Sequence, residues 1–172
     1  LRKVQEAGIE DMWFAAIEKR NAVYVKFGRY PSFEKMDQFG QSLLGYINDN
    51  QVKNLIIDLR GHWGGDFYVG VWLAYYLNLA DNLDWNNGVY TLIDKDTFSA
   101  ATINAVQFKQ LLNAKIVGEP TGSNPHGVQD MGTFKLPNSG LIISYSKRMF
   151  RLQKEANTAL VPDFEVKYSW ES

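Results

Sequence analysis

Apolar residues recur along the chain at two spacings, one typical of strands and one typical of helices. Residues 12–17 (MWFAAI) and 22–27 (AVYVKF) are two β-prone runs with a short polar break between them, which predicts a hairpin. After Pro31, Ser32 is placed to cap a helix, and apolar residues then recur at helical spacing as far as Ile47. The first third of the chain is therefore expected to form a hairpin followed by a helix.

The middle of the chain alternates between strand and helix. Residues 55–57 are an unbroken apolar run, which predicts a strand buried on both faces. Asp66 can cap a helix over 67–79, and the lack of charged residues there predicts that this helix is buried all round. A strand at 89–93 then precedes an Ala-rich helix at 100–112. This alternation predicts an α/β fold with parallel strands joined by right-handed crossovers.

The last third of the chain is predicted to be mainly strand and loop. Its glycines and prolines mark the breaks between short β-prone runs. The expected elements are a strand at 115–118, a loop at 119–127, a hairpin formed by 132–136 and 141–146, and a short strand at 164–167.

Composition narrows the class of protein. The chain has 172 residues, 45% of them hydrophobic and 22% charged, which is typical of a globular domain with a sizeable core. The net charge is −1 and no Lys/Arg-rich stripe occurs, so nucleic acid is not an expected partner. The absence of cysteine excludes disulfides and a cysteine nucleophile. Several aromatic side chains are expected in the core, namely Trp13, Phe14, Trp72, Tyr75 and Tyr76.

Neither a transmembrane segment nor a signal peptide is visible in the sequence. No apolar run reaches the roughly 18 residues that cross a bilayer. Leu1 stands where an initiator Met is usual, so we interpret the chain as processed or as part of a longer product.

Two segments carry candidate chemistry. Residues 58–65 (DLRGHWGG) follow a predicted buried strand, and their glycines would expose backbone N–H groups able to hold an oxyanion. Ser99 begins a predicted helix, where a serine is usually a capping residue. The same place suits a nucleophile, because the free N–H groups and positive dipole of the helix would lie beside a developing oxyanion.

These segments together resemble the carboxy-terminal processing, or tail-specific, family of serine proteases. Family members carry Asp-Leu-Arg-x-Asn-x-Gly-Gly after a buried strand, then Thr-Ala/Phe-Ser-Ser/Ala at a helix start. Val-Gly-Glu-x-Thr, Leu-Pro-Asn/Asp-x-Gly and Pro-Asp follow. The matching segments occur here in the same order, at 58–65, 97–100, 117–121, 136–140 and 162–163.

The resemblance implies a specific fold and site. The fold would be the spiral of β-β-α units shared with ClpP and crotonase, flanked by β-hairpins. Ser99 would be the nucleophile, with an oxyanion hole formed by Ala100 N–H and a glycine of the pair Gly64 and Gly65. Substrates would be polypeptides, often cut near a carboxy terminus, without any metal or organic cofactor. The location would be extracytoplasmic, in the cell envelope or outside it, as for bacterial members.

The resemblance also implies one domain. We expect residues 1–172 to form a single protease core, with 1–21 as a leading segment and first hairpin strand and 22–167 as the core proper. No PDZ domain is evident, and the sequence leaves the oligomeric state open.

The general base is the open question. Most family members use a lysine, and the corresponding position here is Asn124, which cannot act as a base. His126, in the same loop, could serve instead in a Ser–His arrangement. His62 is the other histidine and stands where the family usually has Asn. Candidate acids to orient a histidine are Asp163, Glu119, Asp130 and Glu155.

Two alternatives to an active protease remain. The first is a catalytically inactive protein that binds peptides or other ligands on the same fold, which the missing lysine favours. The second is a piece of the enzyme, with the base or a gating domain supplied by another segment.

Overall fold

A central sheet organises the molecule. The computed structural model describes residues 2–6, 11–153 and 158–167. Within these ranges seven strands form one sheet in the order β1-β2-β3-β4-β5-β6-β9. The strands are β1 (Arg2–Glu6), β2 (Met12–Ile17), β3 (Ala22–Phe27), β4 (Asn54–Asp58), β5 (Val89–Ile93), β6 (Lys115–Gly118) and β9 (Phe164–Glu165).

The sheet is antiparallel at one edge and parallel elsewhere. β1, β2 and β3 pair antiparallel, which confirms the first predicted hairpin, and the short helix η1 (Glu18–Arg20) closes its turn. From β3 to β9 every neighbouring pair is parallel. The α/β prediction is therefore confirmed. The carboxyl ends of β4 and β5 lie next to each other, and both candidate segments follow these two ends.

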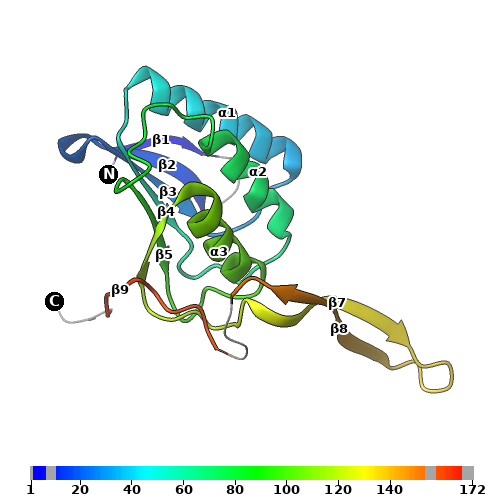
Figure 1. Cartoon of the computed structure of the whole chain (residues 1–172). Coiled ribbons are helices and arrows are strands. Elements are labelled where there is room, and N and C mark those ends of the chain that lie inside the picture. Colours follow the sequence, from blue (N-terminus) through cyan, green and yellow to red (C-terminus); the bar gives the residue numbers. More distant parts are fainter. Residues whose placement is uncertain (1, 7–10, 154–157, 168–172) are drawn as a thin grey trace.

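Three helices cover one face of the sheet (Figure 1). They are α1 (Phe33–Asp49), α2 (Phe67–Leu77) and α3 (Ala100–Leu112), and α2 packs between the other two. The predicted caps are present: Ser32 Oγ accepts from Lys35 N–H at 3.3 Å, and Asp66 Oδ1 accepts from Tyr68 N–H at 3.0 Å. The core lies between the helices and the sheet, with Phe27, Phe39 and Phe108 among its largest buried side chains.

Two burial predictions are wrong, for the same physical reason. The helix α2 is not buried all round, because Trp72 and Tyr75 on its outer face are 37% and 51% exposed. The strand β4 is not fully buried on both faces either, since Ile56 is only half-buried. Helices cover a single face of the sheet, and nothing among the described residues covers the outer face of the helical layer. Apolar composition therefore overstated the burial of both elements.

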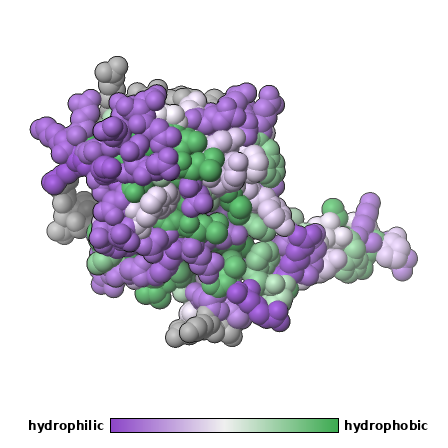
Figure 2. Space-filling model, turned by 45° about the horizontal axis from the view of Figure 1, so that its top comes forward, coloured by the Kyte–Doolittle hydropathy of each residue, from purple (hydrophilic) through white to green (hydrophobic). Residues whose placement is uncertain are grey.

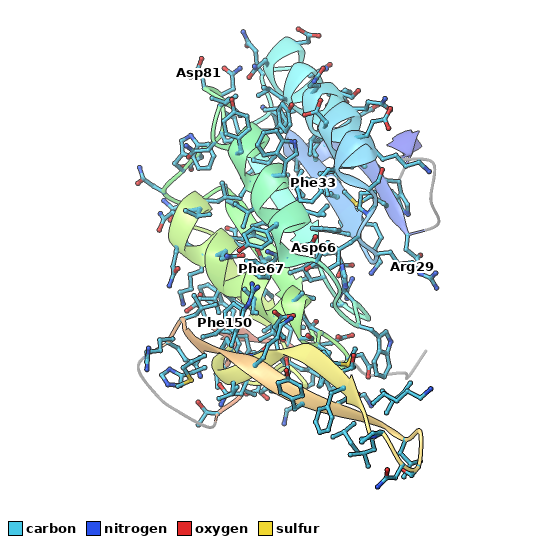
Figure 3. The ribbon with its side chains drawn as sticks, turned by 90° about the vertical axis from the view of Figure 1, so that its right-hand side faces the viewer. Arg29, Phe33, Asp66, Phe67, Asp81 and Phe150 are labelled. Carbon is cyan, nitrogen blue, oxygen red and sulfur yellow. The ribbon has the colours of Figure 1, made fainter. Side chains whose placement is uncertain are left out.

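The second hairpin is longer than predicted and forms an arm. β7 (His126–Lys135) pairs antiparallel with β8 (Ile142–Arg151). Figure 2 shows the arm standing off the body, with hydrophobic and hydrophilic residues side by side along it. At its base Phe150 contacts Phe67 of α2 edge to face, with ring centroids 5.6 Å apart (Figure 3). This contact fixes the base of the arm against the helical layer.

Candidate active site

Ser99 lies at the N-terminal end of α3, in the N-cap position. Its backbone has φ 52° and ψ −121°, a region that side-chain-bearing residues avoid at a cost of about 1–3 kcal/mol. Its side chain makes no capping hydrogen bond, so the ordinary role of a serine at a helix start does not apply. The structure therefore holds a strained serine whose Oγ is not used for capping.

Hydroxyl groups hold the Ser99 backbone in this conformation. Ser99 N–H donates to Ser123 Oγ at 2.7 Å. Ser123 Oγ lies 2.8 Å from Thr102 Oγ1, which donates to the carbonyl oxygen of Thr97 at 3.1 Å. Because a carbonyl only accepts and a hydroxyl carries one proton, Ser123 must be the donor to Thr102. The three hydrogen bonds therefore form one directed series: Ser99 N–H donates to Ser123, Ser123 donates to Thr102, and Thr102 donates to the carbonyl of Thr97.

The double-glycine turn packs directly against Ser99. A Cβ atom on Gly64 would lie 2.8 Å from Ser99 Cβ and 2.9 Å from the carbonyl oxygen of Phe98, so no larger residue fits. Gly64 also has φ +99°, which favours glycine. Phe98 N–H donates to His62 O at 2.9 Å and ties the turn to the serine segment.

The backbone amides of the turn and of the helix start differ in their partners. Gly64 N–H donates to His62 Nδ1 at 3.0 Å. The N–H groups of Gly65 and Ala100 have no acceptor among the residues that the structure describes. Gly65 lines a second cavity, on the other side of the turn from the cavity that contains Ser99. The Ala100 amide lies at the positive end of the α3 dipole.

His62 is buried beneath this turn. The residue is 1% exposed, and its Nε2 has no hydrogen-bond partner among the described residues. Burial, reinforced by the positive charge of Lys26, lowers the pKa of His62 to about 4. The neutral ring accepts through Nδ1, so its proton is on Nε2.

His126 shares a cavity with Ser99. The cavity has a volume of about 690 Å³ and is lined by Phe98, Ser99, Ser123, Asn124, residues 126–131 of β7 and residues 144–146 of β8. No hydrogen bond joins Ser99 Oγ to the His126 ring in the described part of the chain.

The surroundings of His126 fix its ring. His126 Nδ1 lies 2.8 Å from the carbonyl oxygen of Gln153, which can only accept, so Nδ1 is the donor. The neutral ring consequently keeps a lone pair on Nε2. Its backbone N–H donates to Asn124 Oδ1 at 2.8 Å. His126 thus has a fixed Nδ1 partner and lines the cavity that contains Ser99.

Asn124, at the position of the expected lysine, organises the loop. Its Oδ1 accepts from His126 N–H and from Gln153 Nε2, the latter at 3.4 Å. Its carbonyl oxygen accepts from Gln129 Nε2. Asn124 therefore joins the start of β7 to the segment that carries the carbonyl facing His126.

Two of the candidate acids, Asp163 and Asp130, pair with other residues. Asp163 pairs with Lys109 and accepts from Ile116 N–H at 2.9 Å. Burial alone would raise the pKa of Asp163, but these two donors outweigh it and lower that pKa. Asp130 lines the cavity but pairs with Lys147 and Arg148 at 3.6 and 3.2 Å. Glu119 lines a different cavity, and Glu155 lies outside the described residues.

An ion pair between Asp58 and Arg60 lies at the start of the turn. Arg60 donates through Nε and Nη2 to the two oxygens of Asp58 at 2.8 and 2.7 Å. Tyr24 O–H also donates to Asp58, and Lys26 Nζ lies 3.8 Å from it. Burial would raise the pKa of Asp58, but these donors, Arg60 foremost, keep it below its ordinary value.

Sequence reasoning missed three contributors, Ser123, Thr102 and the carbonyl of Gln153. Thr102 gave a weak signal, because a hydroxyl three residues after Ser99 lies on the same side of a helix. Gln153 gave none, since every residue has a carbonyl group.

The described residues show neither a metal-binding cluster nor a membrane-spanning helix. They hold no group of three or more His, Asp or Glu side chains that could bind a metal ion. None of their helices has the length and apolarity to cross a membrane.

The fold is that of known proteases. A protein from Bacteroides fragilis described as an S41 protease superposes with a TM-score of 0.65 at 13% identity, over 95% of this chain and 51% of that one. The photosystem II D1 C-terminal processing protease gives 0.57 at 17%, over 85% and 42%. The tricorn protease gives 0.57 at 19%, over 88% and 16%. This chain spans about half the length of the first of these structures and less of the other two.

Residues 73–166 match peptidase family S41. The chain therefore belongs to this family, which includes the carboxy-terminal processing proteases, and the resemblance seen in the sequence is confirmed. A search among curated proteins finds no match.

Proposed function

We propose that this chain is the core of a serine peptidase that cleaves polypeptides, with Ser99 as nucleophile and His126 as general base. The observation that carries the proposal is the conformation of Ser99. The chain holds this residue in a strained backbone region, without a capping role, on a cavity that also contains a histidine with a fixed tautomer. Strain of this kind is concentrated at functional sites.

The chemistry would follow the Ser–His pattern. Ser99 Oγ attacks the carbonyl carbon of the scissile peptide, and its proton passes to His126 Nε2. The tetrahedral oxyanion is held by the N–H groups of Ala100 and Gly65. His126 then gives its proton to the leaving amine, and an acyl group remains on Ser99 until water, deprotonated by His126, removes it.

In the proposed site the carbonyl of Gln153 accepts from the histidine Nδ1–H, as the aspartate does in a Ser–His–Asp site. Its 2.8 Å contact orients the ring and fixes the proton on Nδ1. A neutral carbonyl stabilises the imidazolium less than a carboxylate does. We therefore expect a slower enzyme than one with a buried acid at this position.

Gly65 is preferred to Gly64 as the oxyanion donor. The Gly64 amide already donates to His62, whereas the Gly65 amide has no acceptor among the described residues. Cleavage near carboxy termini and an extracytoplasmic location belong to the same proposal and rest on the family resemblance.

A non-catalytic binding protein is the second candidate. Two observations favour it: Asn124 replaces the expected lysine, and no hydrogen bond joins Ser99 Oγ to His126 in the described part of the chain. Catalytic hydrogen bonds are often long without substrate, so the second observation does not decide the matter.

Labelling with a fluorophosphonate probe between pH 5 and pH 9 tests the proposal. The unaltered protein should be labelled, and Ser99→Ala should not. Ser139→Ala, which removes an exposed serine in the turn of the arm, is the matched control and should label normally. His126→Ala should slow labelling by about 100-fold or more.

Two results would count against these assignments. If the unaltered protein stays unlabelled over the whole pH range, the enzyme proposal fails and the binding protein is preferred. If labelling depends on Ser99 but survives His126→Ala at full rate, another group is the base.

A further inference from the structure

His62 is the histidine that the proposed mechanism leaves unused, although it lies in the double-glycine turn. Its ring packs edge to face against Phe27 and Tyr30, with centroids 5.3 and 4.4 Å apart. Its carbonyl accepts from Phe98 N–H, one residue before Ser99. His62 thus contacts the core, the turn and the serine segment together.

The ring of His62 forms a side-chain turn. Its Nδ1 accepts from the N–H group two residues further on, that of Gly64. Asn and Asp side chains commonly make the same bond to the backbone two residues on. The bond fixes the orientation of the peptide before Gly64, and so where the next amide, that of Gly65, can point.

We propose that His62 is a positioning residue for the oxyanion hole, which holds the Gly64 amide through Nδ1 and so leaves the Gly65 amide for the substrate oxygen. This inference rests on the proposed serine peptidase activity. In this role the buried histidine is not a general base, and it does more than fill space in the core.

Because this role requires a neutral His62 ring, the hydrogen bond to the Gly64 amide should be lost in acid. A protonated ring has no lone pair on Nδ1 and cannot accept from Gly64. Burial and the positive charge of Lys26 lower the pKa of His62 to about 4, so the bond persists to moderately acidic pH. Lys26 Nζ itself donates to Arg60 O at 2.7 Å. Other titratable or charged groups that line the cavity on this side of the turn are Asp11, Arg29, Tyr30 and Asp66.

Two substitutions separate positioning from packing. His62→Asn keeps an acceptor that can reach the Gly64 N–H but loses ring volume. His62→Leu fills more of the buried space but offers no acceptor. A packing role predicts that leucine is tolerated better than asparagine, and a positioning role predicts the reverse.

The test is the second-order rate of fluorophosphonate labelling at pH 7.5, with thermal unfolding confirming that each variant is folded. The phosphoryl oxygen of the probe occupies the oxyanion hole, so the rate reports its geometry. His62→Asn should stay within about 5-fold of the unaltered protein, whereas His62→Leu should fall by about 100-fold, the usual loss of one donor. Equal rates for both variants, or a faster leucine variant, would overturn the proposal while leaving Ser99 as nucleophile.

A second measurement does not depend on activity. Nitrogen NMR of the histidine rings in Ser99→Ala, titrated from pH 7 to pH 3.5, should place the neutral His62 proton on Nε2. The amide signals of Gly64 and Gly65 should then move together with the His62 ring as it titrates. A proton on Nδ1, or glycine signals that ignore the titration, would overturn the inference. If the unaltered protein is never labelled, the peptidase proposal fails, and the positioning role fails with it even where this bond is observed.

Discussion

The two histidines of this chain have opposite tautomers because their neighbours differ in kind. His62 Nδ1 faces a backbone N–H and must accept, whereas His126 Nδ1 faces a backbone carbonyl and must donate. The first ring therefore presents an N–H at Nε2 inside the core, and the second presents a lone pair at Nε2 on a cavity wall. The same residue type therefore holds a backbone amide in one place and is the proposed general base in the other.

Ser99→Gly should stabilise the protein although it removes the proposed nucleophile. Glycine adopts φ 52° and ψ −121° without the strain that serine carries. Part of the gain is offset by the larger backbone entropy of glycine in the unfolded chain, so we expect a net gain of about 1 kcal/mol. Urea denaturation of Ser99→Gly beside Ser99→Ala measures this. A glycine variant less stable than the alanine variant would mean that the backbone of Ser99 is not strained.

His62 should make stability depend on pH in a defined window. Its pKa is about 4 in the folded protein and about 6.5 in the unfolded chain, so between these values only the unfolded chain binds the proton. Stability therefore falls as pH decreases from 6.5 to 4, by on the order of 3 kcal/mol from this residue alone. Folding lowers the pKa values of Asp58 and Asp163, so these two carboxylates change the stability mainly at more acidic pH.

His62→Asn should remove that slope. The difference in unfolding free energy between the unaltered protein and His62→Asn, measured in urea at several pH values, should shift toward the variant as the solution becomes acidic. Contributions from His126 and the carboxylates cancel in the difference. A difference that is flat from pH 7 to pH 4 would mean that His62 is not buried in neutral form.

At the scale of elements, the start of α3 depends on hydroxyl groups from two segments. Thr102 belongs to the first turn of α3, Ser123 to the loop before β7, and their bond links the two. Thr102→Val keeps the shape of a fully buried side chain but leaves the Ser123 O–H without its acceptor. We expect a loss of about 1–3 kcal/mol, measured by urea denaturation, and slower labelling of Ser99. Thr102→Ser, which retains the hydroxyl, should restore the labelling rate.

The spacing of apolar residues predicted where the helices and strands lie, but it predicted less well which of their side chains are buried. The caps at Ser32 and Asp66 and the bounds of α3 were predicted, because they depend on local backbone chemistry. The exposure of Trp72 was not, because composition does not reveal which face of a helix other elements cover. Within the candidate site, the sequence motif singles out Ser99 as a candidate. The contact from the Gln153 carbonyl was not, because it depends on tertiary structure alone.

At the scale of the whole molecule, the candidate site draws on four segments that are distant in sequence, the last of which follows β8 and carries the Gln153 carbonyl. β4 and β5 are parallel neighbours, so the double-glycine turn and the segment leading to Ser99 emerge at the same edge of the sheet. The loop that carries Ser123 and His126 follows β6, the next strand in the order. The parallel arrangement thus brings Ser99, the proposed nucleophile, to the same edge as the double-glycine turn and His126, and the arm begins there.

The outer part of the arm should be dispensable for folding. Its apolar side chains are largely in solvent, with Phe134, Leu141 and Ile142 at 51%, 62% and 69% exposure, so removing them costs the core nothing. Replacing residues 132–145 by Asn-Gly would join the paired positions Met131 and Ser146 through a two-residue turn. The Phe150 contact at the base would remain. We expect the melting temperature to change by less than about 5 °C.

The same shortening should separate two activities of the cavity. Residues 144 and 145 line the cavity and would be lost, whereas Ser99 and His126, which also line it, would stay. A fluorophosphonate is small and contacts little beyond the nucleophile, so its labelling rate should be within about 3-fold of the unaltered protein. Because residues 144 and 145 line the cavity, we expect them to contact a bound polypeptide, so cleavage of an unfolded polypeptide should fall by about 10-fold or more, since remote binding energy contributes to the chemical step. Equal losses for probe and polypeptide would show instead that the arm supports the geometry of Ser99 itself.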